Sequence, residues 1–217
     1  MADLNKFFEN VDGTRTLEVP AGENIFQQGE PILHFHIPVE GMAKLGWYHQ
    51  SANRLFAIKV PGEILETQTY SATTTRGYFS TAITDLTMLV VGKEEFLQRI
   101  QNDYQLSKEI FSQLETDLSY QKKLKTIETV ATNEVKLALL LDYIAGKINS
   151  CEEIRGKIQP DTIPLNQQEL ADFLTVNRVT ISKYIRSLTQ KGAVKTQCGE
   201  LKVVHREILQ KQFEQYI

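Results

Sequence analysis

The sequence predicts an α+β fold in which a β-sandwich or barrel is followed by a long helix and then by a winged helix-turn-helix. Three observations predict it. Short strand-like runs alternate with turn residues from about residue 15 to 92, and helical spacing replaces that alternation after Lys93. A basic two-helix segment with a hairpin behind it then occupies the region from about residue 166 to 203.

The N-terminal runs have the composition and length of short antiparallel strands. Turn signals such as Pro20-Ala21-Gly22 and Pro61-Gly62-Glu63 separate them. Even spacing of this kind is typical of an all-β sandwich or barrel. The predicted strands are TLEV, NIFQ, HFHIPV, AKLGWYH, RLFAIKV, YFSTAIT and LTMLVV.

The helical region contains an apolar stripe that predicts a partner helix. No proline occurs between Lys93 and Pro160, and apolar residues recur at steps of three, four or six along one stretch. A symmetric dimer follows, although the same stripe could lie on the protein's own β-domain. The predicted dimer contacts are Ile110, Leu114, Leu118 and Leu124.

The stretch from residue 166 to 188 has the spacing of two short helices that cross over a shared apolar centre. Asn166 and Glu169 read as a capping box for the first helix, and Asn177 is a suitable cap for the second. Thr175 departs from the pattern, because the turn position it occupies favours glycine. On the second helix, the apolar residues expected to point inward are Ile181, Ile185 and Leu188.

The outward side of that second helix is basic, in a chain that is acidic as a whole. Residues 177 to 202 hold six Lys or Arg and one acid, against 24 bases and 27 acids in the full chain. AVKT and LKVV then flank a turn at Gly199, which predicts the hairpin of a winged helix. A solvated amphipathic helix would explain the cations alone, but the combination predicts DNA binding. The predicted contacts are Asn177, Arg178, Val179, Thr180, Ser182, Lys183, Arg186, Lys195 and Lys202.

Composition and motifs exclude several other classes. The N-terminus lacks a signal pattern and no apolar run approaches the ~20 residues of a membrane span, so we expect a cytoplasmic protein without a membrane partner. Cys151 and Cys198 are the two cysteines, and each is expected to be a plain thiol. No cofactor, metal site or catalytic residue is predicted, because the Gly-rich phosphate loop, GxSxG and HExxH motifs are absent. We therefore expect no enzyme.

The chain resembles the Crp/Fnr family of bacterial transcription regulators over nearly its full length. The residues that carry the resemblance are AGENIFQQGEP, IPVEGMAKL, PGE, TAITDLTMLVVGKEEF, ELADFLTVNRVTISKYIRSLTQKGAV and GELKVV. It implies a β-roll (a double-stranded jelly roll) that senses an effector over 1–102, a dimerisation helix over 103–131, and a winged-helix DNA-binding domain over 132–217. It also implies a homodimer that binds two-fold symmetric promoter DNA and contacts RNA polymerase.

The resemblance weakens at the effector pocket. Family members that bind cyclic AMP hold it with a Gly-Glu pair and an Arg-Ser pair about ten residues later. Here Glu66 and Arg76 are kept, but Leu65 replaces the glycine and Gly77 replaces the serine. We therefore expect a regulator whose effector, if it has one, is a small molecule other than cyclic AMP. A cyclic-nucleotide-dependent regulator and an enzyme that binds a phosphorylated ligand through Glu66 and Arg76 remain the alternatives.

Two prosthetic groups of the family, an iron–sulfur cluster and haem, are not expected in this chain. The N-terminal cysteine cluster that would hold iron and sulfur is absent. His34, His36 and His49 lie in predicted strands and are expected to be surface or hydrogen-bonded residues rather than haem ligands.

Overall fold

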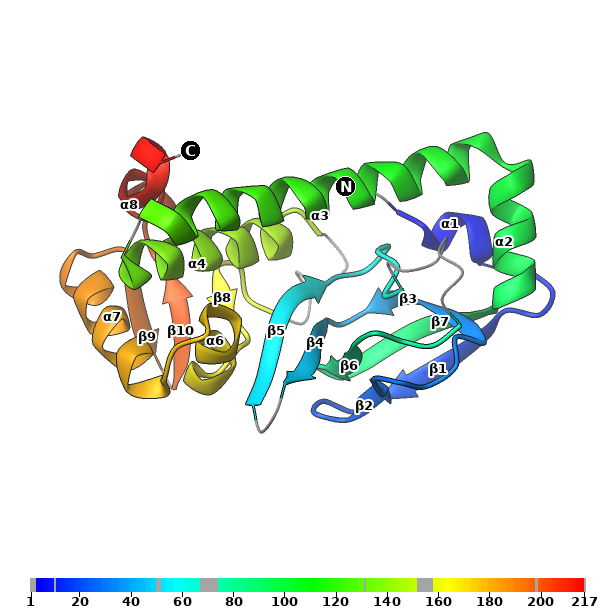
Figure 1. Cartoon of the computed structure of the whole chain (residues 1–217), viewed down its shortest axis with the longest axis horizontal. Coiled ribbons are helices and arrows are strands. Elements are labelled where there is room, and N and C mark those ends of the chain that lie inside the picture. Colours follow the sequence, from blue (N-terminus) through cyan, green and yellow to red (C-terminus); the bar gives the residue numbers. More distant parts are fainter. Residues whose placement is uncertain are drawn as a thin grey trace. The chain divides into compact units, whose positions relative to one another are not determined.

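Figure 1 shows the computed structural model of the chain, which divides into two compact units, Met1–Thr116 and Asp117–Ile217. The structure describes residues 3–9, 11–49, 52–66, 74–130, 132–151, 158–197 and 199–216.

In the described part of the N-terminal unit, seven strands form two antiparallel sheets. Their bounds are β1 Arg15–Val19, β2 Asn24–Phe26, β3 His34–Glu40, β4 Ala43–His49, β5 Ala52–Lys59, β6 Phe79–Ala82 and β7 Leu86–Gly92. One sheet has the order β1-β7-β3 and the other β2-β6-β4-β5. Each predicted run overlaps one of these strands, and the predicted fold class with its β-roll is confirmed.

The central strand β7 is buried on both faces and therefore separates two apolar layers. Met88 and Val90 point into the space between the two sheets, where they meet residues such as Phe26 and Tyr78. Leu89 and Val91 point the other way, toward the helices. Strict alternation along a strand places successive side chains on opposite faces, and here each face is covered.

Three helices cover the outer face of the β1-β7-β3 sheet (Figure 1), and they are α1 Asn5–Phe8, α2 Lys93–Asn102 and the first turns of α3 Tyr104–Val130. Asp103 ends α2 and starts α3, because its carboxylate accepts hydrogen bonds from the backbone N–H groups of Gln105 and Leu106 at 2.9 and 3.0 Å. Phe96 and Leu106 are buried against the sheet.

The position of Ile110 corrects the predicted dimer contact. Its side chain is 2 % exposed and packs in the core of its own unit with Phe35, Ile64 and Val91. Leu114 is partly buried against the same core, whereas Leu118 is 54 % exposed. Ile110 therefore helps to hold α3 on the β-domain. The Leu124 side chain lies outside the described residues.

The C-terminal unit is a winged helix. Its elements are α4 Asn133–Asn149, β8 Thr162–Ile163, α6 Gln167–Leu174, α7 Arg178–Gln190, β9 Val194–Gln197, β10 Glu200–Val203, α8 Arg206–Phe213 and η1 Glu214–Tyr216. The three strands form an antiparallel sheet of order β8-β10-β9. The sequence did not predict β8, since a strand of two residues carries no periodic signal.

Helix α4 forms the centre of this unit. Leu137, Leu140, Leu141 and Ile144 are fully buried in it. Gly146 lacks the Cβ that would approach the Arg206 guanidinium of α8 to 2.9 Å, and Arg206 Nε donates to Asp142 Oδ1 at 2.7 Å across that gap. A glycine within a helix costs about 1 kcal/mol relative to alanine, and here it makes room for that ion pair.

Cys151 is a buried thiol, as expected. Cys198 lies outside the described residues.

Candidate functional sites

The first helix of the helix-turn-helix begins with the predicted capping box. Asn166 Oδ1 accepts hydrogen bonds from the backbone N–H groups of Gln168 and Glu169 at 2.8 and 3.0 Å. The Glu169 carboxylate accepts one from the Asn166 backbone at 2.7 Å in return. This reciprocal pair satisfies amide groups that have no partner within α6 and fixes where the helix starts.

The turn between α6 and α7 contains Thr175 in a backbone conformation that favours glycine and is unusual for threonine. Thr175 has φ 59° and ψ 35°, which is the left-handed region. For a β-branched residue this costs roughly 1–2 kcal/mol, so the surrounding contacts must hold the turn. Asn177 then caps α7, because its Oδ1 accepts from the Thr180 backbone N–H and from the Thr180 hydroxyl, both at 2.8 Å.

Helix α7 has one buried and one exposed side. Ile181, Ile185 and Leu188 are 0, 6 and 0 % exposed, as predicted. The opposite side presents exposed Arg178, Val179, Lys183 and Arg186.

The remaining predicted contacts on this segment have different surroundings. Thr180 and Ser182 are half-buried. Since the Asn177 Oδ1 and the Thr180 hydroxyl bond to each other, these two groups hold the start of the helix. Of the predicted residues on α7, Arg178, Val179, Lys183 and Arg186 are exposed.

The wing places two cations opposite each other. Strands β9 and β10 pair with Lys195 directly across from Lys202, and Gly199 supplies the left-handed turn at φ 85°. Lys195 is exposed, and Lys202 donates a hydrogen bond to Gln159 Oε1. Like charges at directly opposite positions destabilise a strand pair. A polyanion near the wing would relieve this repulsion.

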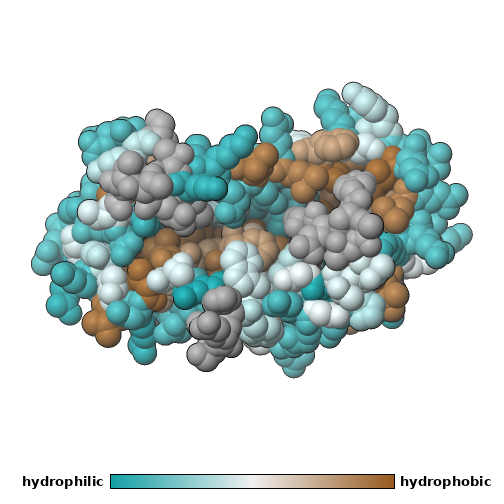
Figure 2. Space-filling model, viewed as in Figure 1, coloured by the Kyte–Doolittle hydropathy of each residue, from teal (hydrophilic) through white to brown (hydrophobic). Residues whose placement is uncertain are grey.

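Four cations of this region have no acidic partner among the described residues, whereas Lys191 pairs with Glu134. Among the described residues, Arg178, Lys183, Arg186 and Lys195 make no ion pair. Figure 2 shows a mostly hydrophilic surface over α7. Unneutralised cations on one helix face and on the adjacent hairpin produce the positive potential that attracts nucleic-acid phosphates.

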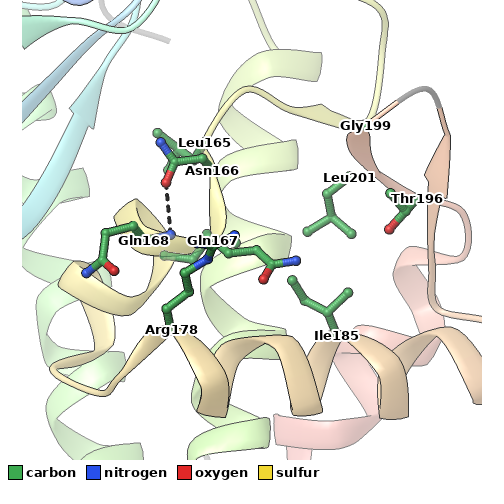
Figure 3. A pocket seen from close by; sticks show the side chains of 10 residues that line it. Leu165, Asn166, Gln167, Gln168, Arg178, Ile185, Thr196, Gly199 and Leu201 are labelled. Carbon is green, nitrogen blue, oxygen red and sulfur yellow. Dashed lines mark hydrogen bonds between the residues drawn. The ribbon is translucent and has the colours of Figure 1, made fainter.

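A pocket of about 390 Å³ lies between α6, α7 and the wing (Figure 3). Leu165, Leu170, Ile185 and Leu201 supply its apolar lining. Polar groups line the rest of it, from Asn166, Gln167, Gln168, Arg178 and Thr196. The pocket thus joins an apolar floor to amide, hydroxyl and guanidinium donors beside the start of α7.

The predicted effector residues in the N-terminal unit form a closed, buried cluster. Glu66 Oε1 accepts from Arg76 Nη1 at 2.5 Å and lies 2.6 Å from His36 Nδ1. Glu66 Oε2 accepts from the His36 backbone N–H at 2.8 Å. These three residues are 2, 6 and 7 % exposed, in the order Glu66, Arg76, His36.

The electrostatics of this cluster keep the carboxylate charged. Burial raises the pKa of Glu66, but His36 and Arg76 lower it more, so the pKa lies below its ordinary value of 4.5. The Arg76 guanidinium also lies over the Phe26 ring, with Cζ 3.8 Å from the ring centroid. Arg76 is therefore already engaged by a carboxylate and an aromatic face.

Leu65 and Gly77, which stand where cyclic-AMP-binding family members carry glycine and serine, have different surroundings. Leu65 is fully buried in the core between the sheets, and its carbonyl accepts a hydrogen bond from the Tyr78 hydroxyl at 2.9 Å. Gly77 is exposed. The structure thus brings Glu66 and Arg76 together, leaves Gly77 at the surface, and adds His36, which sequence reasoning did not connect to the pocket.

Two family models match the sequence. The cyclic nucleotide-binding domain matches residues 16–103, and the Crp-like helix-turn-helix domain matches residues 136–212. The chain belongs to the Crp/Fnr family of transcription regulators. For this Crp/Fnr regulator the family models cover both the β-roll and the winged helix, and they support DNA binding as the activity of the C-terminal unit.

Solved structures of the same family have the fold of this regulator. FixK2 from Bradyrhizobium japonicum is 14 % identical with a TM-score of 0.75, covering 92 % of this chain and 96 % of its own. A Crp/Fnr-family transcriptional regulator from Thermus thermophilus is 18 % identical with a TM-score of 0.68, covering 94 % and 100 %. A CooA mutant from Carboxydothermus hydrogenoformans is 15 % identical with a TM-score of 0.73, covering 97 % and 96 %. No curated protein sequence matches the chain significantly.

The part of the regulator that the structure describes shows neither a membrane-spanning helix nor a metal-binding cluster. Within it, no helix is long and apolar enough to cross a membrane. No three His, Cys, Asp or Glu side chains among the same residues gather closely enough to hold a metal ion. Sequence reasoning missed Gln167, Gln168 and Thr196 in the pocket, although the two consecutive glutamines at the start of α6 were a visible signal.

Proposed function

We propose that the regulator binds a specific, two-fold symmetric promoter site as a homodimer and does not take cyclic AMP as its effector. The observation that carries the proposal is the open face of α7, where Arg178, Lys183 and Arg186 have no acidic partner among the described residues and Val179 is 79 % exposed. Arginine and lysine donate to guanine in the major groove, and an apolar side chain contacts the thymine methyl.

The wing and the pocket extend this interface onto the DNA backbone. Phosphate contacts fix the register of a protein on the duplex, while base contacts read its sequence. Lys195 and Lys202 would neutralise phosphates beside the groove. Gln167 and Thr196 would donate to phosphate oxygens, while the apolar floor of the pocket would receive a deoxyribose. In this arrangement the N-terminal half of α7 contacts the bases.

The exposed side of α3 supports the homodimer. Tyr104, Phe111 and Leu118 follow one another at seven-residue intervals and are 77, 65 and 54 % exposed. Residues at this interval lie on one face of a helix and form the seam of a coiled coil. Hydrophobic side chains come to the surface along α3 in Figure 2. A second copy of the same helix would cover them in an isologous contact.

The Glu66 cluster supports the exclusion of cyclic AMP. A cyclic phosphate would need the Arg76 guanidinium, which Glu66 and Phe26 already hold. Releasing the Arg76 guanidinium would leave the buried Glu66 carboxylate without this charged partner. Breaking a buried pair in this way costs about 3–5 kcal/mol. The match to the cyclic nucleotide-binding domain keeps a cyclic-nucleotide-dependent regulator as the second candidate.

One experiment separates these candidates. A site is first selected from random duplexes with the purified chain, and its affinity is then measured with and without cyclic AMP at about 1 mM. We expect a symmetric site, no change in affinity and no rise in melting temperature, because a ligand that binds the folded state stabilises it. A cyclic-AMP-dependent gain in both would establish the second candidate, and equal affinity for all duplexes would remove the proposed specificity.

The remaining assignments follow from this role. A regulator of transcription works where the chromosome lies, so we place the protein in the bacterial cytoplasm with RNA polymerase as its partner. We assign it no enzymatic activity. A turnover screen with nucleotides and phosphorylated substrates tests this assignment, and any turnover that tracks the protein through purification would contradict it.

A further inference from the structure

Glu134 connects the start of α4 to the end of α7. It lies in the first turn of α4, and its side chain is 20 % exposed. Glu134 Oε1 accepts a hydrogen bond from Ser187 Oγ at 2.9 Å and another from Lys191 Nζ at 2.6 Å. One carboxylate oxygen therefore holds both the last turn of the recognition helix and its C-terminal cap.

The cap residue is held from a third helix as well. Lys191 follows the last residue of α7, and its Nζ also donates to Gln212 Oε1 of α8 at 3.0 Å. A cation at this place complements the partial negative charge of the helix C-terminus. Lys191 is thereby kept in the unit's own polar network rather than presented as a free cation beside Arg186.

The contacts of Ser187 and Lys191 lie at the C-terminal end of α7, whereas the side chains proposed to face the bases begin at its N-terminal end, with Arg178. Ser187 lies nine positions after Arg178, which at 1.5 Å per residue is about 13.5 Å of helix. Rotating α7 by about 5° around Ser187 would therefore move the backbone near Arg178 by about 1 Å. Such a displacement breaks a hydrogen bond to a base edge, since donor–acceptor distances are confined to about 2.7–3.2 Å.

The apolar contacts on the buried side of α7 restrict this rotation less sharply than directional bonds do. Ile181, Ile185 and Leu188 hold the helix against its unit through apolar contacts, which are not directional. Hydrogen bonds to an ionised carboxylate are directional and about twice as strong as neutral ones. The angle of α7 thus depends on the polar contacts at its end.

We propose that Glu134 is a positioning residue that sets the angle of the recognition helix and so determines how well the regulator discriminates between DNA sequences. The inference rests on the proposed docking of α7 in the major groove. Its consequence is specific, because loss of the Glu134 charge lowers discrimination while leaving binding to random DNA intact. That binding depends on phosphate contacts, and Lys191 released from Glu134 adds a cation to them.

The test compares affinities for the selected site and for a random duplex in the full-length chain. Glu134→Gln keeps an oxygen that accepts from Ser187 but removes the ion pair with Lys191. We expect the ratio of the two affinities to fall about tenfold, the loss of about one base contact, with random-duplex affinity unchanged or raised. Lys191→Met should lower the ratio similarly, and the double variant should lower it no further, because both changes break one pair.

Asp142→Asn is the matched control. Asp142 is a carboxylate on the same helix, but its partners, Arg206 and Gln210, belong to α8. We expect this variant to lower the melting temperature and to keep the affinity ratio.

The outcomes distinguish the inference from the proposed function. If the parent chain discriminates and Glu134→Gln discriminates equally well, this inference is wrong while the proposed function stands. A proportional loss of both affinities with a lower melting temperature would show a merely structural role and would also overturn it. If the parent binds all duplexes alike, the proposed specificity fails, and the inference fails with it.

Discussion

Val179 is the exposed apolar residue on the recognition face of α7. It is an apolar side chain, 79 % exposed, at a place where family members commonly carry a glutamate. A glutamate there can accept a hydrogen bond from cytosine N4, whereas valine offers apolar contact such as that with a thymine methyl. The neighbouring Arg178 is kept, and Lys183 stands where an arginine is usual. We therefore expect an operator that differs from the usual half-site at one central base pair.

Replacing Val179 tests whether α7 lies in the major groove with this residue facing the bases. Val179→Glu should change the preferred base at one position of each half-site by roughly tenfold or more between competing sites, since a good base contact is worth about 1–3 kcal/mol. Selection from random duplexes measures the change. Val179→Thr, which keeps one methyl group, is the control and should shift the preference least, whereas Arg178→Ala should mainly lower affinity. An unchanged ranking of sites with Val179→Glu would mean that Val179 does not face the bases.

The Glu66 cluster makes a prediction about acid stability. The folded-state pKa of Glu66 lies below 4.5, so its carboxylate contributes stability above that pH and loses the contribution as pH falls through the folded value. Glu66→Gln should therefore destabilise the N-terminal unit at pH 7, by about 3 kcal/mol, and progressively less as the pH falls below 4.5.

The measurement uses a probe that belongs to this unit alone. Trp47 in β4 is the single tryptophan of the chain, so its fluorescence during urea unfolding reports on the N-terminal unit. Glu18→Gln, at an exposed position of β1, is the control. A difference between parent and Glu66→Gln that stayed constant from pH 7 to pH 3 would contradict the assigned pKa shift.

We expect the wing to contribute DNA affinity that does not depend on the DNA sequence. If Lys195 and Lys202 each neutralise a phosphate, replacing either with alanine should weaken all duplexes alike. The slope of log K against log salt should become shallower by about 0.9 for each lysine removed. Titrations at several salt concentrations measure this, with Lys108→Ala on the N-terminal part of α3 as the control. A loss confined to the selected site would assign the wing to base reading instead.

Helix α3 should hold the two copies of the chain together through its exposed apolar side chains. Replacing Phe111 and Leu118 with aspartate would place unpaired charges in the proposed seam, where burying an ion costs several kcal/mol. The double variant should sediment as a monomer. Ser112→Asp with Ser119→Asp is the matched control, because those exposed positions have the same spacing on another side of the helix. A dimer that survived the first pair of changes would place the contact elsewhere.

The same helix shows where sequence reasoning stops. Helical spacing correctly identified an apolar stripe, but periodicity does not say which apolar surface faces the stripe. Ile110 meets Phe35 and Val91, which come from strands far away in the sequence, so its burial depended on the tertiary fold. His36 illustrates the same limit, because 30 residues separate it from Glu66. The caps at Asn166 and Asn177 were predictable because their partners lie within three residues.

The proposed homodimer must place its two copies of α7 in successive major grooves. Half-sites of such a dimer lie about one helical turn apart, roughly 10 base pairs. Each copy then raises the effective concentration of the other at its half-site, which multiplies affinity by about 10² to 10⁴. The spacing between half-sites should therefore matter as much as their sequence.

Insertion of five base pairs at the centre of the selected site tests this arrangement. It rotates one half-site by about half a turn, so that the two recognition helices no longer reach both grooves. We expect the affinity of the parent chain to fall toward that for a single half-site, as measured by anisotropy titration, whereas five base pairs added outside the site should change little. The Phe111→Asp and Leu118→Asp double variant should bind original and expanded sites equally, because each monomer uses one half-site. If the parent chain were equally insensitive to the insertion, it would bind as a monomer, and the two-fold symmetric mode of recognition would be wrong.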